Sequence, residues 1–385
     1  MSVRVEKPAF NLREKLSELD VPVGAHGGHL MRSKSPQETF DLVSAGRKNL
    51  IINGAMLISQ RGSTTNSNGF GVDRFKGNVN GMSNLVTNYT IDTQAPPGFM
   101  RSLRVDVTTA ESDGGNASNK FLRIMYNMEA YDCQPLAAGT PNAKPFTLSF
   151  WVKSHATGRY AVSVWVEDAG ITSNFTYEIH QSDVWTYVTH TFPPISVPSW
   201  DIDVNNGLGL RINWLIGCGP DYGGGASGTE VNGRWTGYTS ASLGAFHSAN
   251  VLSSTDNDWR LTGVQLEVGD SATPFEHRLY AEELALCKRY YEEILLKGIP
   301  SGGYSGASGG YDNHLLGVAY AVEKRTVPTL TYDSVGNYQP GGGTGTPSTL
   351  YGHAKVLCIK TGSANSTWQP QVINSNAYAY VDAEL

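Results

Sequence analysis

The chain has 385 residues, enough for roughly two or three domains with cores of their own, and only 17% of its residues are charged. A net charge of -6 without any basic run argues against a nucleic-acid groove or an anionic membrane surface as partner. No apolar stretch approaches the ~20 residues that span a bilayer, and the opening MSVRVEKPAF lacks the apolar core of a secretory signal. The four cysteines form no C-x-x-C pair, so we expect free thiols and assembly in a reducing cytoplasm.

Residues 1–47 are predicted to form a helical segment. Asn11 can cap a first short helix, and Ser35, followed by Pro36, can cap a second. The apolar side chains of these two helices are Leu12, Leu16, Leu19, Phe40 and Val43. Two helices this short cannot bury a core, so we expect these side chains to contact another protein. The alternative is that they fold back on the domain that follows.

Residues 48–279 carry the period-two pattern of β-strands. Apolar side chains alternate through 146–154 and again through 159–167, which predicts a hairpin with its turn near Gly158. Further strand candidates are 100–109, 119–129, 174–180, 184–192, 207–216 and 258–268. About ten strands without intervening helices predict an antiparallel sandwich of the jelly-roll type.

The pattern changes at Tyr280. Apolar side chains alternate with polar ones up to Val268, whereas beyond Tyr280 they recur at helical spacing. The members of this stripe are Tyr280, Leu284, Cys287, Tyr291 and Ile294. We expect a connecting helix over 280–297. Residues 298–385 contain further strand candidates, at 314–326, 328–335, 354–361 and 377–385, and predict a small C-terminal β-sandwich.

No catalytic constellation is present in the sequence. It lacks the G-x-S-x-G, H-E-x-x-H and phosphate-loop motifs, and its carboxylates single out no pair for glycoside hydrolysis. His26 and His29 have no carboxylate or thiol partner nearby in the sequence. Asp73-Arg74 is expected to be a structural ion pair or a turn contact. We therefore expect no enzymatic activity, no cofactor and no metal.

Aromatic side chains in polar loops are the candidates for binding. A ring face stacks on the C–H groups of a sugar, while amide and carboxylate neighbours bind its hydroxyls. The candidates are Tyr222, Trp235 and Tyr238 in the Gly-rich segment 218–251, Tyr304 and Tyr311 in a Gly-Ser stretch, and Tyr338 and Trp368 in the last domain. Trp151 and Trp165 lie opposite the apolar rows of their strands. They either pack under a loop, cover a subunit contact or form a sugar platform.

Three stretches resemble the tail-fibre and virion structural proteins of phages, especially marine and cyanobacterial phages. They are NLREKLSELDVPVG at 11–24, RKNLIINGAMLISQRG at 47–62, and TGVQLEVGDSATPFEHRLYAEELALCKRYY at 262–291. The strand FTLSFWVKS is similar to one that recurs in carbohydrate-binding jelly rolls. The resemblance covers most of residues 1–291. The family's Asp-Arg-Trp motif stands here as Asp73-Arg74-Phe75, which lacks the indole N–H.

The resemblance implies a homotrimeric fibre without catalysis. The N-terminal segment would dock on the virion, through phage tail or adaptor proteins, and the distal domain would meet a host-surface glycan. The stripe that begins at Tyr280 would then pack on its own sandwich or form a seam between three copies. Two alternatives remain, a capsid-attached fibre or adaptor and a glycan depolymerase, although the short repeats of depolymerase β-helices are not found.

Overall fold

The computed structural model describes residues 47–62, 64–65, 68–82, 85–111, 117–225, 233–295, 300–301, 314–332, 338–339, 347–352, 354–361, 371–373 and 378–385. The chain divides into two units, 1–48 and 49–385. The predicted N-terminal helices lie outside the described residues, as do their side chains Leu12, Leu16, Leu19, Phe40 and Val43. No helix in the described ranges is long and apolar enough to cross a membrane.

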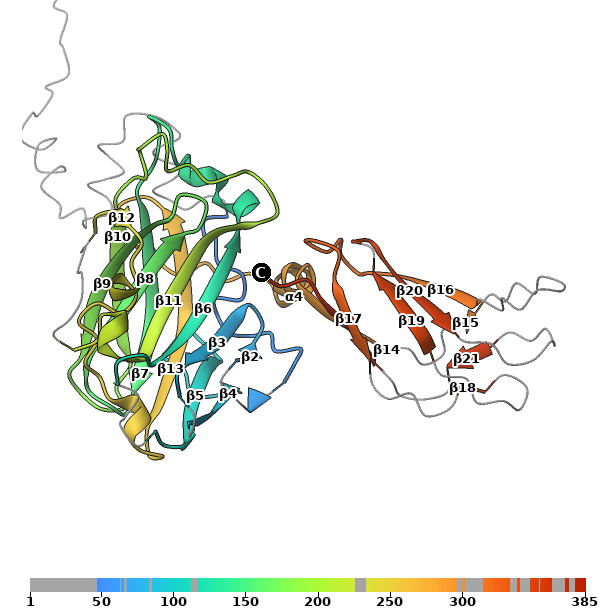
Figure 1. Cartoon of the computed structure of the whole chain (residues 1–385), viewed down its shortest axis with the longest axis horizontal. Helices are drawn as coiled ribbons and strands as arrows, with labels where there is room; N and C mark the ends of the chain where they lie inside the picture. The colour runs from blue at the N-terminus through green and yellow to red at the C-terminus, as the bar shows by residue number, and fades with distance from the viewer. Residues whose placement is uncertain are drawn as a thin grey trace, which may run out of the picture. The chain divides into compact units, whose positions relative to one another are not determined.

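Two antiparallel sheets form a sandwich in the second unit, and this confirms the predicted mainly β class. The six-stranded sheet runs β1 (Thr64–Thr65), β4 (Val86–Asp92), β5 (Ser102–Thr109), β13 (Asp258–Val268), β7 (Phe146–Ser154), β10 (Thr186–Phe192). The seven-stranded sheet runs β12 (Thr236–Gly237), β9 (Ile171–Ile179), β8 (Gly158–Val166), β11 (Leu208–Cys218), β6 (Phe121–Glu129), β3 (Phe75–Asn80), β2 (Phe70–Val72). The strands from β9 to β2 follow one another from left to right in Figure 1. Short 3-10 helices lie at Ala130–Leu136, Pro220–Tyr222, Ser240–Ser242 and Val251–Ser253.

The predicted hairpin of 146–154 with 159–167 is wrong. Both segments are strands, but β7 pairs with β10 and β13 in one sheet, whereas β8 pairs with β9 and β11 in the other. The turn between them therefore carries the chain from one sheet to the other, and both apolar rows enter the same core. Alternation records which face of a strand is buried. It does not distinguish a neighbour beside the strand from one across the core.

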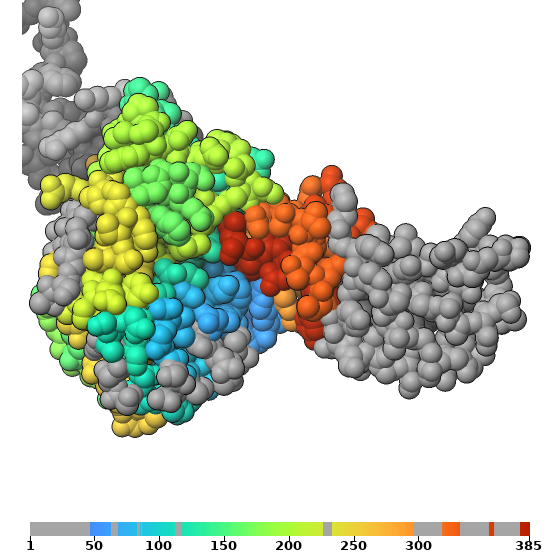
Figure 2. All heavy atoms as spheres, viewed as in Figure 1, coloured from blue at the N-terminus to red at the C-terminus, as the bar shows by residue number. Residues whose placement is uncertain are grey.

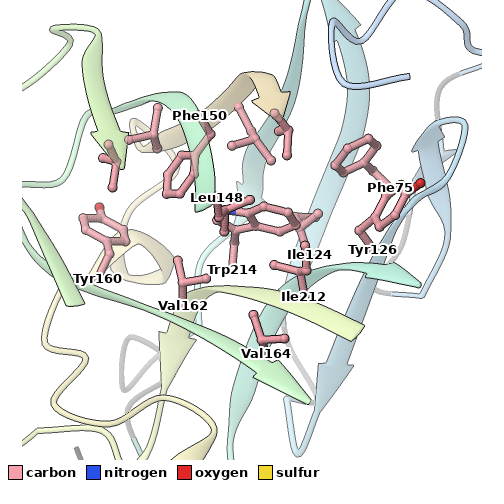
Figure 3. Close-up of a cluster of buried hydrophobic side chains, with 14 of the residues drawn as sticks. Phe75, Ile124, Tyr126, Leu148, Phe150, Tyr160, Val162, Val164, Ile212 and Trp214 are labelled. Carbon is pink, nitrogen blue, oxygen red and sulfur yellow. The ribbon is translucent and has the colours of Figure 1, made fainter. Parts of the chain in front are cut away.

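Trp214 of β11 lies in the middle of this core (Figure 3). Its ring centroid is 5.9 Å from that of Phe150 in the opposite sheet, with the planes at 90°, and 6.1 Å from that of Phe75. Tyr126 stands beside Phe75, and its hydroxyl accepts a hydrogen bond of 2.8 Å from the backbone N–H of Ile52. Edge-to-face packing of such large rings adds to the stabilisation that their burial provides.

Asn53 and Gly54 organise the loop that enters the sandwich. The Asn53 side chain is buried. Its oxygen accepts hydrogen bonds from the N–H groups of Leu57 and Ile58, and its amide donates to the carbonyls of Ile58 and Asp73. Gly54 lies so close to β13 that an added Cβ would stand 2.1 Å from the carbonyl oxygen of Val264. Only glycine permits this approach of the two backbones.

The helix α4 begins at Tyr280, as predicted, but it ends at Lys288 and not at 297. Residues Tyr291–Leu295 instead form a strand, β14, which pairs with β22 (Tyr378–Asp382) near the end of the chain. This long-range pairing overrides the local helical spacing at Tyr291 and Ile294. Cys287 is buried in a cluster with Ile52 and Ile58, so this part of the stripe packs on its own sandwich, whereas Tyr280 is 60% exposed.

Three small antiparallel sheets make up the C-terminal part. One joins β14, β22 and β17 (Thr329–Tyr332). The others are formed by β15 (Pro300–Ser301), β21 (Gln371–Ile373) and β18 (Tyr338–Gln339), and by β16 (His314–Ala319), β20 (Val356–Thr361) and β19 (Pro347–Gly352). The predicted strand positions near the starts of 314–326 and 328–335, and within 354–361 and 377–385, are confirmed.

The last residues of the chain pack against the sandwich. Glu384 forms ion pairs with the buried Arg74 and, at 3.4 Å, with Arg61. The Arg74 guanidinium lies over the ring of Tyr290 at 3.4 Å and faces that of Tyr126 at 5.3 Å. Figure 2 shows the last residues, in red, against the blue residues of the sandwich. Arg74 occupies the two-residue turn between β2 and β3, so Asp73-Arg74 is a turn contact whose arginine pairs elsewhere.

Cys133, Cys218 and Cys287 are free and buried, as expected for thiols that serve packing. Burial raises the pKa of Cys218 to about 12, and it also raises the pKa of Cys133 and of Cys287. None of these thiols is a thiolate at neutral pH, which makes them poor nucleophiles.

His247 is predicted to make the sandwich sensitive to acid. It is 1% exposed, its Nε2 lies 3.1 Å from the carbonyl oxygen of Ala249, and burial lowers its pKa to about 4. The folded state therefore favours the neutral ring. Its stabilising contribution is complete above pH ~6.5 and is lost as the pH falls toward 4, at most about 3 kcal/mol.

Urea unfolding between pH 7 and pH 4 measures this effect. We expect the His247→Gln variant to lose about 2–3 kcal/mol less free energy of unfolding over this interval than the parent. The partly buried His190, whose pKa is also lowered to about 4, titrates in both proteins and serves as an internal reference. Equal acid losses in the variant and the parent would contradict the assignment.

Candidate functional site

The outward face of the seven-stranded sheet carries two arginines. Arg123 on β6 and Arg211 on β11 each lie between buried residues that face the core, so both side chains point away from it. In the register of these strands Arg211 stands opposite Asn127, and Arg123 stands opposite Leu215. Asn213 lies between the two arginines on the same face of β11.

An aromatic pair lies beside Arg211. Trp165 on β8 is its register partner, and the guanidinium carbon of Arg211 lies 4.7 Å from the centroid of the Trp165 ring. The Tyr238 ring packs on the same indole with a centroid distance of 5.3 Å and an interplanar angle of 32°. A 2.9 Å hydrogen bond from the Tyr238 N–H to the Gly170 carbonyl positions this loop, and the tyrosine remains 39% exposed.

A second aromatic pair lies beside Arg123. Its guanidinium carbon is 4.9 Å from the centroid of the Phe121 ring. Tyr222 packs on Phe121 edge to face, with a centroid distance of 4.7 Å and an angle of 87°. The Tyr222 hydroxyl accepts a 3.0 Å hydrogen bond from the side-chain amide of Asn80. These contacts position the tyrosine that follows the strand β11.

Side-chain amides position both guanidinium groups. Nε of Arg123 donates to Oδ1 of Asn78 at 3.0 Å, and its Nη1 donates to Oδ1 of Asn213 at 3.1 Å. Nε of Arg211 donates to Oδ1 of Asn127 at 2.8 Å. Neutral acceptors orient the cations without neutralising their charge.

The two charges act on each other. Burial, and to a smaller extent the nearby Arg211, lower the pKa of Arg123 to about 10, while the phenols of Tyr238 and Tyr222 act in the opposite direction. Burial also lowers the pKa of Arg211, against the influence of Glu167 and Tyr238. Arg123 remains cationic at neutral pH, since a pKa of about 10 lies well above it, and arginine side chains such as that of Arg211 are effectively always protonated in proteins.

These residues form one surface, which we call the arginine–aromatic band. Its members are Tyr222, Phe121, Arg123, Arg211, Trp165 and Tyr238. At its Arg211 end the band combines the exposed ring of Tyr238 with cationic N–H donors and amides, whereas Phe121 at the other end is buried in a small cluster with Leu215 and Leu243. Such a surface can stack on a flat apolar patch of a ligand and donate hydrogen bonds to oxygens at its edge.

The structure places the predicted aromatic candidates in different environments. Tyr222 and Tyr238 are brought together on the band. Trp235 is buried, its Nε1 donates to the Pro193 carbonyl at 2.9 Å, and its ring lies 6.0 Å from both Phe146 and Phe192, so it is a packing residue. Tyr304, Tyr311 and Trp368 lie outside the described residues, and Tyr338 lies in β18.

Trp165, one of the two outward tryptophans of the sequence, supports Tyr238 on the band. Trp151 lies on the other sheet, where its ring is 5.1 Å from that of Tyr187 at 42°. Arg123 and Arg211 were not among the sequence candidates. Their outward positions follow from the alternation of β6 and β11, but the pairing of these two strands does not.

No protein-family model matches this chain. No curated protein matches it either. Among solved structures, the enzymatically active domain of Bacteriophage CBA120 tailspike protein 4 is similar with 11% identity and a TM-score of 0.30, over 57% of this chain and 21% of that one. This chain thus spans about a fifth of that structure.

Two solved structures of family 11 carbohydrate-binding modules from Clostridium thermocellum are also similar to parts of this chain. A family 11 module of a cellulosomal cellulase has 11% identity and a TM-score of 0.28, over 56% of this chain and 99% of that one. A family 11 module in complex with a β-1,3-1,4-mixed-linked tetrasaccharide has 10% identity and a TM-score of 0.27, over 57% and 100%. Similarity at this level does not indicate what this chain binds.

Proposed function

We propose that this chain is a non-catalytic fibre protein of a phage virion and that it binds a host-surface glycan through the arginine–aromatic band. The binding part of the proposal rests on the exposure and the packing of the Tyr238 side chain. Its ring is 39% exposed and packs on Trp165, which in turn contacts the guanidinium of Arg211. A pyranose stacked on Tyr238 would place its hydroxyls beside cationic N–H donors.

The virion part of the proposal is supported by the sequence resemblance at 11–24, 47–62 and 262–291. This part of the proposal states that the protein is a homotrimer, that residues 1–47 attach it to tail or adaptor proteins, and that it is located on the virion. Three linked bands would raise the avidity for a repetitive glycan by ~10²–10⁴ where the geometry lets them engage together. A solution mass equal to a single chain at micromolar concentration would contradict the homotrimer.

Tyr238→Ala tests the binding part. We expect the variant to bind the glycan selected on an array about tenfold more weakly, because it loses a stacking contact of about 1–1.5 kcal/mol. Binding is measured by calorimetry with the full-length protein, and a thermal melt verifies that the variant is folded.

Tyr187→Ala is the matched control. Tyr187 is also exposed and also packs on a tryptophan, but it lies on the six-stranded sheet, away from the two arginines of the band. We expect this variant to bind as the parent does. A larger loss from Tyr187→Ala than from Tyr238→Ala would move the site to the other sheet and overturn the assignment.

A further inference from the structure

We propose that the ligand of the arginine–aromatic band is a saccharide that carries an anionic group, and that this group binds at Arg211 with Arg123 beside it. The inference rests on the proposed function, since it names the class of glycan that the band selects. The inference follows from the amide and ring contacts that these two arginines make, and from their lack of carboxylate partners within the described residues.

Six partly or fully buried arginines elsewhere in the described residues have carboxylate partners, whereas Arg101, which is also partly buried, forms no ion pair within those ranges. The six are Arg61, Arg74, Arg104, Arg260, Arg278 and Arg289. Arg325 donates to several backbone carbonyls instead. Arg123 and Arg211 form no ion pair within the described ranges, although both are partly buried. Partial burial of two neighbouring cations is costly unless an anion compensates them.

The terminal nitrogens of Arg211 are hydrogen-bond donors without an acceptor in the described part of the chain. Its Nε–H is used by Asn127, while its Nη1 and Nη2 donate to no acceptor in the described part of the chain and neither atom is buried. The terminal nitrogens of a guanidinium match the two oxygens of a carboxylate or of a sulfate ester. The stacking of Arg211 on Trp165 and its bond to Asn127 fix the plane of this fork before a ligand arrives.

The charge of the whole chain makes this site selective. With a net charge of -6 the protein repels polyanions in general, so their binding requires a local cationic site. The exposed Tyr238 ring next to Arg211 adds a contact that a free inorganic anion cannot make. The two features together indicate an anionic group attached to a sugar ring.

A glycan array printed with acidic glycans beside their neutral counterparts tests the inference, followed by titration of the full chain with two matched pairs. The first pair is polygalacturonate and its methyl ester, and the second is dextran sulfate and dextran. We expect the acidic member of one pair to bind at least about tenfold more tightly, as for a hydrogen bond between charged groups, and this preference to shrink with added salt.

Arg211→Gln is expected to remove the preference for the acidic member, because it loses the cationic fork, so that the variant binds the acidic and the neutral member with similar affinity. Arg211→Lys keeps the charge but not the planar fork, so an intermediate loss is expected. Arg159→Gln is the control, because Arg159 lies on β8 of the same sheet in an exposed ion pair with Glu178 and its removal changes the net charge equally. It is expected to bind as the parent does.

The outcomes separate the two proposals. Preference for polygalacturonate assigns the site to carboxylates, and preference for dextran sulfate assigns it to sulfate esters; both support the inference. Equal binding of acidic and neutral glycans overturns it and leaves the proposed function intact. An equal loss in Arg211→Gln and Arg159→Gln also overturns it, since the attraction would then be non-specific. Failure to bind any glycan on the array overturns the proposed function itself.

Discussion

Glu384→Gln is expected to lower the free energy of unfolding by about 3–5 kcal/mol, because it leaves the Arg74 guanidinium buried without its counter-charge. The side chain of Arg74 is 1% exposed, and that of Glu384 is 8% exposed. The Arg74 guanidinium also packs against the rings of Tyr126 and Tyr290, which limits the access of water to it. Urea unfolding measures the loss, and hydrogen exchange in β22 shows whether the C-terminal strand opens first.

Two further variants define the cause of this loss. Glu178→Gln breaks the exposed ion pair with Arg159 and is expected to cost less than about 1 kcal/mol. Arg74→Met combined with Glu384→Gln removes both charges, and it should recover part of the stability that Glu384→Gln loses alone. A single Glu384→Gln variant as stable as the parent would show that the pair contributes little.

Asn53→Ala is expected to destabilise the sandwich by about 3–5 kcal/mol. The change removes the four side-chain hydrogen bonds of Asn53 and leaves their partners buried. It also places alanine at a φ of 61°, which asparagine tolerates better than other residues that carry a Cβ. Thermal and urea unfolding measure the effect.

Asn53→Gly separates the two contributions. Glycine loses the same hydrogen bonds but adopts a positive φ without strain, so this variant should be about 1 kcal/mol more stable than Asn53→Ala. Equal stability of the two variants would show that the backbone conformation contributes nothing. Parent-like stability of both would show that the hydrogen bonds do not stabilise the loop.

The strands of the sandwich are predictable from the sequence because each has one buried face. Period-two alternation in 119–129, 207–216 and 258–268 gives β6, β11 and β13. The partners of each strand are not predictable in this way. Segments 146–154 and 159–167 satisfy the pattern of a hairpin, yet they enter different sheets, since the same apolar row can face a strand across the core.

The end of α4 depends on a contact that is distant in the sequence. Tyr291 and Ile294 continue the helical spacing, but their backbones pair with β22, more than eighty residues later in the chain. No local signal records such a partner. The candidate site also depends on contacts between residues that are distant in the sequence. Tyr222 and Tyr238 are recognisable as loop aromatics, whereas an isolated outward arginine such as Arg123 is indistinguishable in sequence from one that only contacts solvent.

Asn127 connects the proposed binding face with the last residues of the chain. Its Oδ1 accepts from Arg211, its Nδ2 donates to the carbonyl of Leu385 at 2.8 Å, and its own carbonyl accepts from Arg74. A rotation of the last strand that withdraws Leu385 frees the Asn127 amide to turn, and Arg211 then loses the acceptor that orients it. If the proposed site binds a glycan, mechanical tension on the C-terminal strands would therefore change its affinity for that glycan.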